Sequence, residues 1–422
     1  MKPRELRDAH AHLPQHGRAA EMVRLDGCAS KEACLSQLAA ACDASADGWI
    51  LGAGLRAESW SEPTYPTARE LDEAVRGRAC CAWSFDYHAL VASSVALASA
   101  GITPHSADPP GGIVCRDQRS GEPTGLVLEA AAHLVWDAVP APSEADRRRH
   151  VLRAVADMKR LGFVEVHDLH APPWLGPMLA ELDDADELGI RVELFPPLAR
   201  IESSAEQAGS WRRDRVRLGG GKVFVDGTLN SRTAWMLSDF ADPLPGHPRG
   251  QALMNPDELD EAIRRVDALG LPLAAHAIGD AAVRAVLDAI ERVRPRTPGF
   301  RIEHAELIDE IDVPRFASLG VICSPQPCHL LPDIEALTRL LPHRLDRVLP
   351  LRELIDAGTK PSELLLFGSD TPIVRPDPED SVHAAVHRRR AGMDVSASIA
   401  PDQAIEPAEA WAAFALHSTA PV

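Results

Sequence analysis

The stretch that decides the fold is residues 271–304, LPLAAHAIGDAAVRAVLDAIERVRPRTPGFRIEH. The apolar run over 271–276 predicts a buried strand, and apolar residues at helical spacing over 281–293 predict a helix. A second apolar run, 300–304, predicts another strand, which ends 28 residues after the first. Because strand and helix alternate in this way, the stretch is typical of a parallel sheet covered by helices.

The same alternation continues on both sides of this unit. A further helix is predicted over 257–269, and further strands are predicted over residues 163–167, 190–195, 222–225, 320–324 and 363–368. With the two strands above and the one that carries residues 8–13, these make eight. Eight parallel strands with intervening helices predict an α/β fold of the TIM type, a (β/α)8 barrel.

A long insertion separates the first predicted strand from the second. It runs over residues 17–160, with Pro- and Gly-rich turns at 104–112 and a predicted helix at 144–161. We interpret residues 1–422 as one hydrolase barrel and the insertion as a lid region beside its mouth. A shorter Pro-rich loop, 242–248, follows the fourth strand.

The composition excludes several classes of partner. The chain has 62 acidic and 44 basic residues and a net charge of −18, which disfavours nucleic acid and anionic membrane surfaces. The N-terminus shows no apolar signal-peptide segment, and we expect a cytoplasmic protein. The expected partner is a small-molecule substrate. The eight cysteines include no Cys-x-x-Cys pair, and free thiols are expected.

The segment Asp8-Ala9-His10-Ala11-His12-Leu13 carries two histidines at i and i+2. On a strand these side chains point to the same face, so that both imidazoles can bind one metal ion. Taken alone, such a pair is more often an ordinary polar pair than a metal site.

Other nitrogen and oxygen donors stand at the ends of the predicted strands, where barrel active sites lie. Lys222 is in the fourth strand, His276 and His304 end the fifth and sixth, and Asp370 follows the eighth. The sequence therefore predicts a metal centre at His10, His12, Lys222, His276, His304 and Asp370. The ordinary alternatives are a histidine bonded to a backbone carbonyl and, for Asp370, the cap of a helix.

Lys222 is one of only five lysines, against 39 arginines. Because the chain uses arginine almost everywhere that a positive charge is needed, a lysine on an inner strand of the barrel suggests that a reactive amine is needed there. Apolar surroundings lower the pKa of a lysine, and the neutral amine can add carbon dioxide to give a carbamate that bridges two metals. The alternative is a buried ion pair with Asp226.

The order His-x-His, Lys, His, His, Asp resembles the amidohydrolase superfamily. Residues 222–234 (KVFVDGTLNSRTA), 276–280 (HAIGD) and 301–304 (RIEH) are similar to its YtcJ-like branch, which includes N-substituted formamide deformylases. Residues 85–89 (FDYHA) and 121–129 (GEPTGLVLE) of the insertion agree with it. Members usually carry a small β-sandwich, and only seven residues precede Asp8 here, so we expect the sandwich to be missing.

The resemblance implies one or two divalent metal ions, with zinc expected first. His10, His12 and Asp370 would hold the more buried ion, His276 and His304 the second, and a carbamate on Lys222 would bridge them. A hydroxide shared by the metals would be the nucleophile, and Asp370 would pass its proton to the leaving nitrogen. The residues expected to contact substrate are Trp60, His88, Asn230, Arg232, Trp235, Cys328 and His329.

The expected reaction is hydrolysis of a non-peptide C–N bond in an N-acyl or N-formyl amide. A lactone or ester hydrolase would use the same metals. A mononuclear deaminase would leave Lys222 without an evident role. A non-catalytic metal-binding scaffold is the alternative outside enzymes, and a homo-oligomer is also left open.

Overall fold

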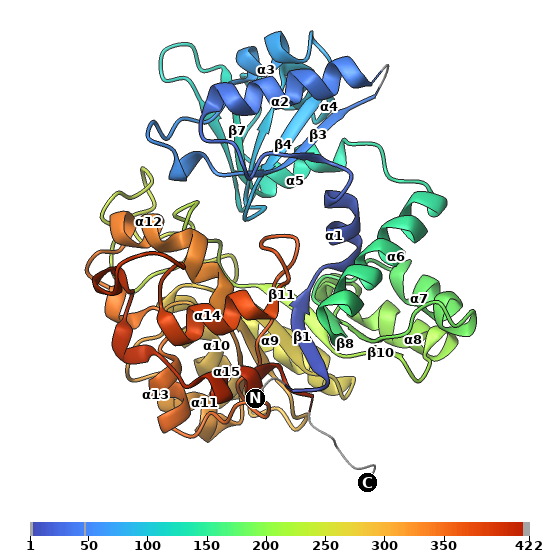
Figure 1. Ribbon diagram of the computed structural model, residues 1–422, viewed down its shortest axis with the longest axis vertical. Helices are drawn as coiled ribbons and strands as arrows, with labels where there is room; N and C mark the ends of the chain where they lie inside the picture. The colour runs from blue at the N-terminus through green and yellow to red at the C-terminus, as the bar shows by residue number, and fades with distance from the viewer. Residues whose placement is uncertain (1–2, 46–47, 417–422) are drawn as a thin grey trace. The chain divides into compact units, whose positions relative to one another are not determined.

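The computed structural model describes residues 3–45 and 48–416. The chain forms two compact units, drawn in Figure 1: a larger unit of residues 1–17 with 148–422 and a smaller unit of residues 18–147. Each unit is considered by itself.

The larger unit contains two four-stranded sheets in which every paired strand is parallel. In order, the first is β1 (Leu6–Ala11), β8 (Phe163–Asp168), β9 (Arg191–Leu194) and β10 (Val216–Leu218), and the second is β11 (Gly221–Phe224), β12 (Leu273–Ala277), β13 (Arg301–His304) and β14 (Ile322–Ser324). The predicted α/β class with parallel sheets is confirmed. The predicted strand at 363–368 is not a regular strand, but Leu365 forms a parallel bridge with Cys323.

Ten helices that lie wholly or mostly in the described part of the larger unit follow or flank these strands. They are α6 (Glu144–Leu161), α7 (Leu175–Asp184), α8 (Ile201–Trp211), α9 (Pro256–Ala268), α10 (Asp280–Val293), α11 (Val313–Leu319), α12 (Leu330–Leu340), α13 (Leu351–Asp356), α14 (Pro378–His387) and α15 (Pro407–Phe414). The start of α9 is specified locally, because Asn255 and Glu258 form a capping box around Pro256 at the first turn.

The core of the larger unit lies between its strands and helices. Every residue of β12 is buried, and α10 buries an apolar face that includes Val283, Val286 and Leu287. Close packing also explains a glycine before β11, since a Cβ on Gly220 would lie 2.5 Å from the carbonyl oxygen of Pro272. The segments that lead into β11 and β12 therefore lie in close backbone contact.

The smaller unit is built on a six-stranded mixed sheet that the sequence pattern did not predict. Its order is β2 (Val23–Arg24), β3 (Ile50–Leu55), β4 (Cys80–Ser84), β5 (Ala89–Ala92), β7 (Pro123–Glu129) and β6 (Gly112–Arg116), with α2 (Lys31–Ala44), α3 (Ala68–Ala74), α4 (Ser94–Ser99) and α5 (Ala130–Asp137). Several of these strands are short and rich in Ala, Gly and Cys, so they lack the β-branched residues that mark a strand.

The boundary between the units differs from the expected insertion of residues 17–160. Most of α6 belongs to the larger unit, because Val151, Val155 and Met158 on its buried face join the core of that unit. Helix α1 (Leu13–Ala19) joins β1 to the insertion, and its first five residues belong to the larger unit.

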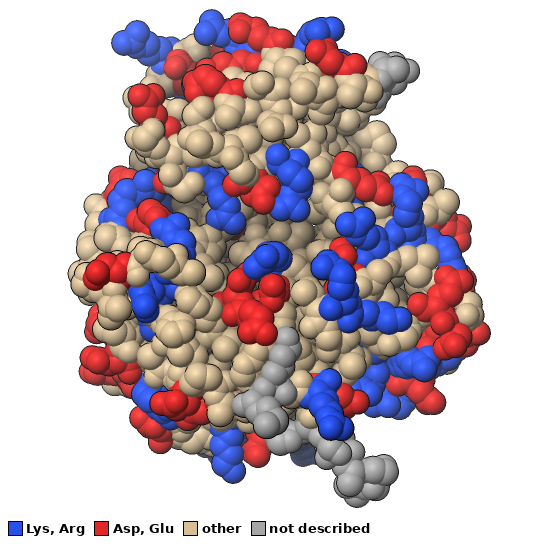
Figure 2. Space-filling view, in the orientation of Figure 1, with Lys and Arg blue, Asp and Glu red and all other residues tan. Residues whose placement is uncertain are grey.

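No helix within residues 3–45 and 48–416 is long and apolar enough to cross a membrane. On the face that Figure 2 shows, acidic and basic side chains are interspersed. The excess negative charge is therefore not segregated into a single region on that face.

Candidate metal centre

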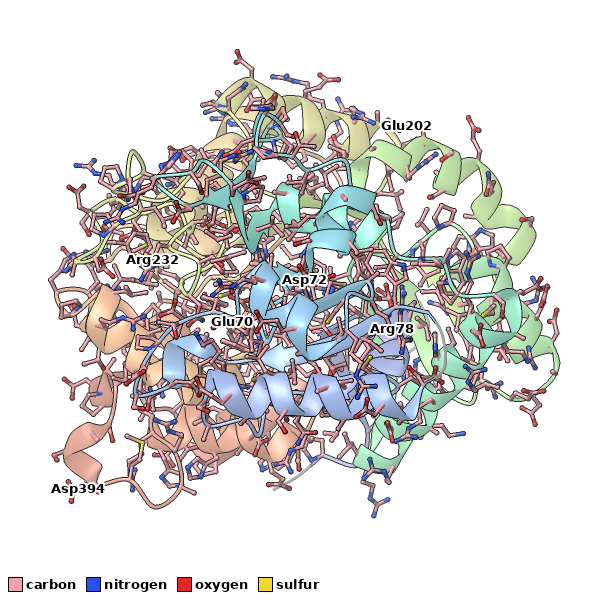
Figure 3. All side chains as sticks on the ribbon, turned by 90° about the horizontal axis from the view of Figure 1, so that it is seen from above. Glu70, Asp72, Arg78, Glu202, Arg232 and Asp394 are labelled. Atoms are coloured by element: carbon pink, nitrogen blue, oxygen red, sulfur yellow. The ribbon has the colours of Figure 1, made fainter. Side chains whose placement is uncertain are left out.

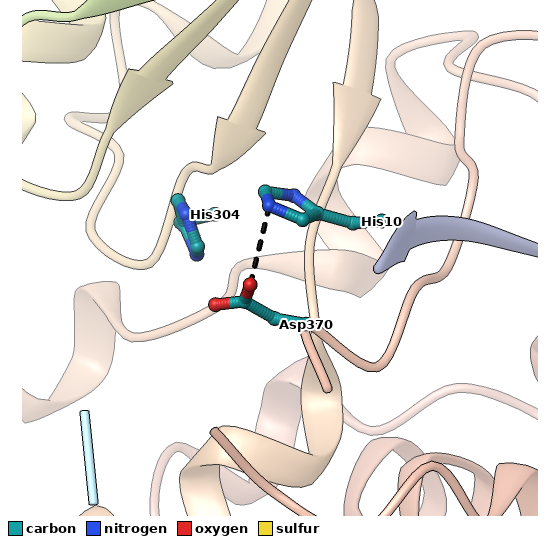
Figure 4. Close-up of side chains that lie close together, drawn as sticks. All are labelled: His10, His304 and Asp370. Atoms are coloured by element: carbon teal, nitrogen blue, oxygen red, sulfur yellow. Dashed lines mark ion pairs between the residues drawn. The ribbon is translucent and has the colours of Figure 1, made fainter. Parts of the chain in front are cut away.

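His10, His12 and Asp370 are brought together by the backbone. The segment that holds Asp370 runs beside β1, where Asp370 N donates to His10 O (2.6 Å) and His12 N donates to Thr371 O (3.0 Å). As a result, Asp370 Oδ1 lies 3.3 Å from His10 Nε2 and 3.0 Å from His12 Nε2. Figure 4 shows the carboxylate of Asp370 facing the His10 ring.

His276 and His304 approach from the second sheet. β12 and β13 pair in a register that sets His276 against Glu303 and Ala277 against His304. The ring centroids of His276 and His304 are 4.4 Å apart, and those of His10 and His304 are 4.9 Å apart. Four of the predicted histidines and Asp370 therefore form one continuous cluster.

Lys222 lies on β11 and is 2% exposed. Its Nζ has no hydrogen-bond partner among the described residues and lies 5.1 Å from the centroid of the Phe224 ring. Burial lowers the pKa of Lys222 to about 8, although the charges of Glu303 and Asp370 oppose this shift. A buried amine with a lowered pKa is the state that the carbamate hypothesis requires.

The alternative of a Lys222–Asp226 ion pair is wrong. Asp226 is fully buried, and its carboxylate accepts hydrogen bonds from the backbone N–H groups of Ile278 (3.0 Å), Gly279 (2.8 Å) and Trp235 (2.9 Å). Asp226 thus joins the loops that follow β11 and β12.

Two further alternatives were a helix-capping role for Asp370 and a histidine bonded to a backbone carbonyl; the first is wrong and the second holds for His276. Asp370 is not a helix cap, since α14 begins at Pro378 and is capped by Asp377. His276 does make the contact of an ordinary core histidine, because its Nε2 lies 3.2 Å from the carbonyl oxygen of Gly227.

The protonation of the cluster suits metal ligation. Burial lowers the pKa of His10 to about 4 and that of His304 well below its ordinary value. Burial alone would raise the pKa of Asp370, but His10 and His12 hold it below its usual range. Neutral imidazole and ionised carboxylate are the forms that bind a metal ion.

A metal ion also fits the unsatisfied atoms of the cluster. His10, His304 and Asp370 each offer a ligand atom, and these atoms lie within 4.8 Å of one another. Among the described residues, His12 Nδ1, His304 Nδ1 and Lys222 Nζ are buried without a hydrogen-bond partner. Because buried polar atoms are normally satisfied, this set is consistent with a site for a cation with N and O ligands.

The family model for the amidohydrolase family matches residues 6–420. The chain belongs to the amidohydrolase family. It is 32% identical to the protein LONG AFTER FAR-RED 3 of Arabidopsis thaliana, over 90% of this chain and 67% of the relative. It is 28% identical to the putative amidohydrolase YtcJ of Bacillus subtilis (90% and 72%) and 27% identical to the N-substituted formamide deformylase of Arthrobacter pascens (87% and 69%).

A solved structure is also similar to this amidohydrolase. An uncharacterized metal-dependent hydrolase from Pyrococcus horikoshii superposes with a TM-score of 0.76 at 26% identity, over 97% of this chain and 78% of that one. The resemblance to the YtcJ-like branch is confirmed by the family match and by the relatives above.

The residues predicted to contact substrate in this amidohydrolase lie in different surroundings. His329 lies beside the cluster: its Nε2 is 3.9 Å from Asp370 Oδ2 and its Nδ1 is 3.6 Å from Glu306 Oε1. Burial alone would lower the pKa of His329, but the hydrogen bond with Glu306 and the charge of Asp370 have the larger effect and raise the pKa to about 9.

The remaining predicted residues of the larger unit are held by other partners. Asn230 Nδ2 donates to the buried Asp333 (2.8 Å), and the backbone of Trp235 is fixed by Asp226. Arg232, labelled in Figure 3, donates to Asp242 (3.0 Å). Cys328 is buried, and its Sγ lies 3.9 Å from Ser369 O.

Trp60 and His88 lie in the smaller unit. Trp60 Nε1 donates to Cys28 O (2.9 Å), and His88 Nδ1 lies 2.7 Å from Glu129 Oε2. Their contact with substrate stays a prediction.

Sequence reasoning missed several residues next to the cluster. Glu303 lies 2.7 Å from His10, and the buried Glu306 forms a second group of potential metal ligands with His304 and His329. Arg301 and Glu303 stand two positions apart on β13, so their side chains lie on the same face of the strand. This i, i+2 spacing of two charged residues in RIEH was the available signal for a buried polar network. It was not used, because strands of a buried parallel sheet usually carry apolar residues.

Proposed function

We propose that this amidohydrolase is a metal-dependent hydrolase that cleaves a non-peptide C–N bond in an N-acyl or N-formyl amide. The observation that carries the proposal is the convergence of His10 Nε2 and His12 Nε2 on Asp370 Oδ1, at 3.3 and 3.0 Å, beside the ring of His304. The metal-dependent hydrolase of P. horikoshii and the formamide deformylase of A. pascens support it.

The proposal includes two divalent ions, with zinc expected first. His10, His12 and Asp370 would hold one, and His276 and His304 the other. The amine of Lys222 would add carbon dioxide, forming an N–C bond and releasing a proton, and the resulting carbamate would help to hold the ions. A bound divalent ion supplies charge that polarises a carbonyl and acidifies water.

We also propose that the two parallel sheets belong to one (β/α)8 barrel. Backbone contacts support this at three places: Pro197 bridges Lys222, Cys323 bridges Leu365, and Ala11 bridges Thr371, all in parallel orientation. β10 and β11 would then be two parts of the fourth strand. The eighth position would be taken by residues 365–371.

In the proposed reaction, water adds to the carbonyl carbon of the amide and the C–N bond then breaks. Asp370 is ionised, so it accepts a proton from the attacking water and returns it to the leaving nitrogen. The products are a carboxylic acid and an amine. His329 is placed to contact the substrate beside Asp370, since it lies 3.9 Å from that carboxylate.

Trp60, His88, Asn230, Arg232, Trp235 and Cys328 remain proposed to shape the substrate site. A small-molecule substrate, a cytoplasmic location and a homo-oligomer also remain proposals. All eight cysteines are unpaired, which is consistent with a reducing compartment.

The test is hydrolysis by the full chain after loading with zinc. N-alkyl and N-aryl formamides and other N-acyl amides would be compared with lactones and carboxylic esters, with release of amine, acid or alcohol measured. Faster turnover of amides supports the proposal. Turnover of esters or lactones alone contradicts the C–N assignment, and tight zinc binding without turnover of any class supports the scaffold alternative.

A further inference from the structure

A buried polar network lies directly behind His10. Arg301 and Glu303 project from the same face of β13, and the two side chains are 3% and 0% exposed. Arg301 Nε donates to Glu303 Oε1 and Arg301 Nη2 donates to Glu303 Oε2 (3.1 Å). The network continues to the first strand, because Glu303 Oε2 lies 2.7 Å from His10 Nδ1.

Arg301 is itself held on several sides. Its Nη2 donates to Ala9 O (2.7 Å) and to Ser324 Oγ (2.7 Å), and its Nη1 donates to His167 Nδ1 (2.9 Å). These partners lie on β1, β14 and β8 or immediately beside them. The guanidinium is therefore fixed, and it holds Glu303 as an ionised, paired carboxylate.

Both carboxylate oxygens of Glu303 accept hydrogen bonds from Arg301, so the 2.7 Å contact of Glu303 Oε2 is made by a proton on His10 Nδ1. The Gln326 amide nitrogen, which donates one hydrogen to Ser324 O (2.8 Å), lies 3.3 Å from the same atom. The charge-assisted contact with Glu303 is shorter, at 2.7 Å, and therefore decides where the proton lies. The other ring nitrogen, Nε2, lies 3.3 Å from Asp370 Oδ1 and is left as the ligand atom of the ring.

We propose that Glu303 is a positioning residue for the metal centre, which fixes the Nδ1–H tautomer and the ring orientation of His10 while Arg301 anchors Glu303. This inference rests on the proposed metal-dependent function. Carboxylate partners of this kind orient ligating histidines and increase their basicity, and their loss typically weakens metal binding about 10- to 100-fold.

The test has two readouts that do not depend on activity. The first is the tautomer of His10 in the metal-free full chain, read from the ¹⁵N shifts of its ring and assigned by comparison with His10→Gln. The second is the zinc dissociation constant, measured by competition with a chelator, for Glu303→Ala and Glu303→Gln.

The matched control is Asp312→Asn. Asp312 is also 0% exposed and paired with two arginines, Arg284 and Arg315, both at 2.8 Å. We expect wild-type His10 to be the Nδ1–H tautomer, Glu303→Ala to bind zinc about 10- to 100-fold more weakly, and Glu303→Gln to be intermediate. The control should change zinc binding less than twofold.

Two results would overturn the inference: His10 protonated on Nε2 in the wild-type chain, or zinc affinity in Glu303→Ala equal to that of the control. The tautomer measurement needs no variant of Glu303, so it decides the matter even if that variant does not fold. If the wild-type chain binds no zinc, the proposed function fails, and the tautomer still reports separately on Glu303.

Discussion

Lys222 and Asp226 stand four residues apart, yet Asp226 is bonded to backbone N–H groups while Lys222 Nζ has no hydrogen-bond partner among the described residues. The carboxylate that could have neutralised the lysine is committed to joining two loops. This leaves the amine buried, with its pKa lowered to about 8 by desolvation. The structure thus removes the simplest non-functional explanation for this lysine.

The first prediction concerns Lys222→Ala. If the lysine carries a bridging carbamate, the variant should bind fewer than two metal ions per chain and lose most of its activity. Metal content measured by elemental analysis, together with amide turnover, checks this. Lys360→Ala is the control, because that side chain is 70% exposed. Two ions and full activity in Lys222→Ala would rule out the carbamate.

The second prediction concerns Asp370→Asn. The amide cannot take up a proton as the carboxylate does, so kcat should fall about 10²- to 10⁴-fold, the usual contribution of a general acid or base. Asp377→Asn is the control, since asparagine caps a helix as well as aspartate does. A kcat within threefold of the control would mean that Asp370 does not transfer the proton.

The third prediction concerns metal removal. Because the proposed ligands come together only in the folded chain, chelation should lower Tm and added zinc should restore it. At a free zinc concentration 100 times Kd, the free energy of unfolding should rise by about 2.7 kcal/mol. Thermal unfolding of the chelated and reloaded chain measures the effect, and an unchanged Tm would argue against a bound metal in the folded state.

The fourth prediction concerns acid stability and Glu165. Burial alone would raise the pKa of Glu165, but the hydrogen bonds of its carboxylate with His167 and Arg191, with the charges of His167 and Arg7, lower it from 4.5 to about 2. The ionised form is therefore favoured in the folded state. Its contribution to stability is fully present above pH about 4.5 and is lost as the pH falls towards 2.

Glu165→Gln should accordingly be less stable than the wild-type chain at pH 6, and the difference should shrink between pH 4.5 and 3. Urea unfolding at a series of pH values gives the difference in the free energy of unfolding. A difference that stays constant over this range would show that the ionisation of Glu165 is not coupled to folding.

The parallel strands and main helices of the larger unit were predictable because apolar periodicity is strong in them. The predicted helices 257–269 and 281–293 differ from α9 and α10 by one residue at each end or less. The smaller unit was not predictable as a sheet, since segments such as ILGAGL and CCAWS carry few β-branched residues. The eighth predicted strand is not a regular strand. Its backbone makes a parallel bridge at Leu365 with Cys323 and a hydrogen bond from Ala9 N to Phe367 O, but no continuous ladder among the described residues.

The sequence by itself determined the candidate ligands, because side chains at the carboxyl ends of parallel strands must gather at one edge. It could not determine how those ligands are paired. Only the tertiary structure decided that Asp226 is bonded to the backbone, that Asp370 contacts His10 and His12, and that Glu303 contacts His10. These contacts join residues up to 360 positions apart in the chain (His10 and Asp370), and their distances depend on strand register and close packing, which local sequence patterns do not encode.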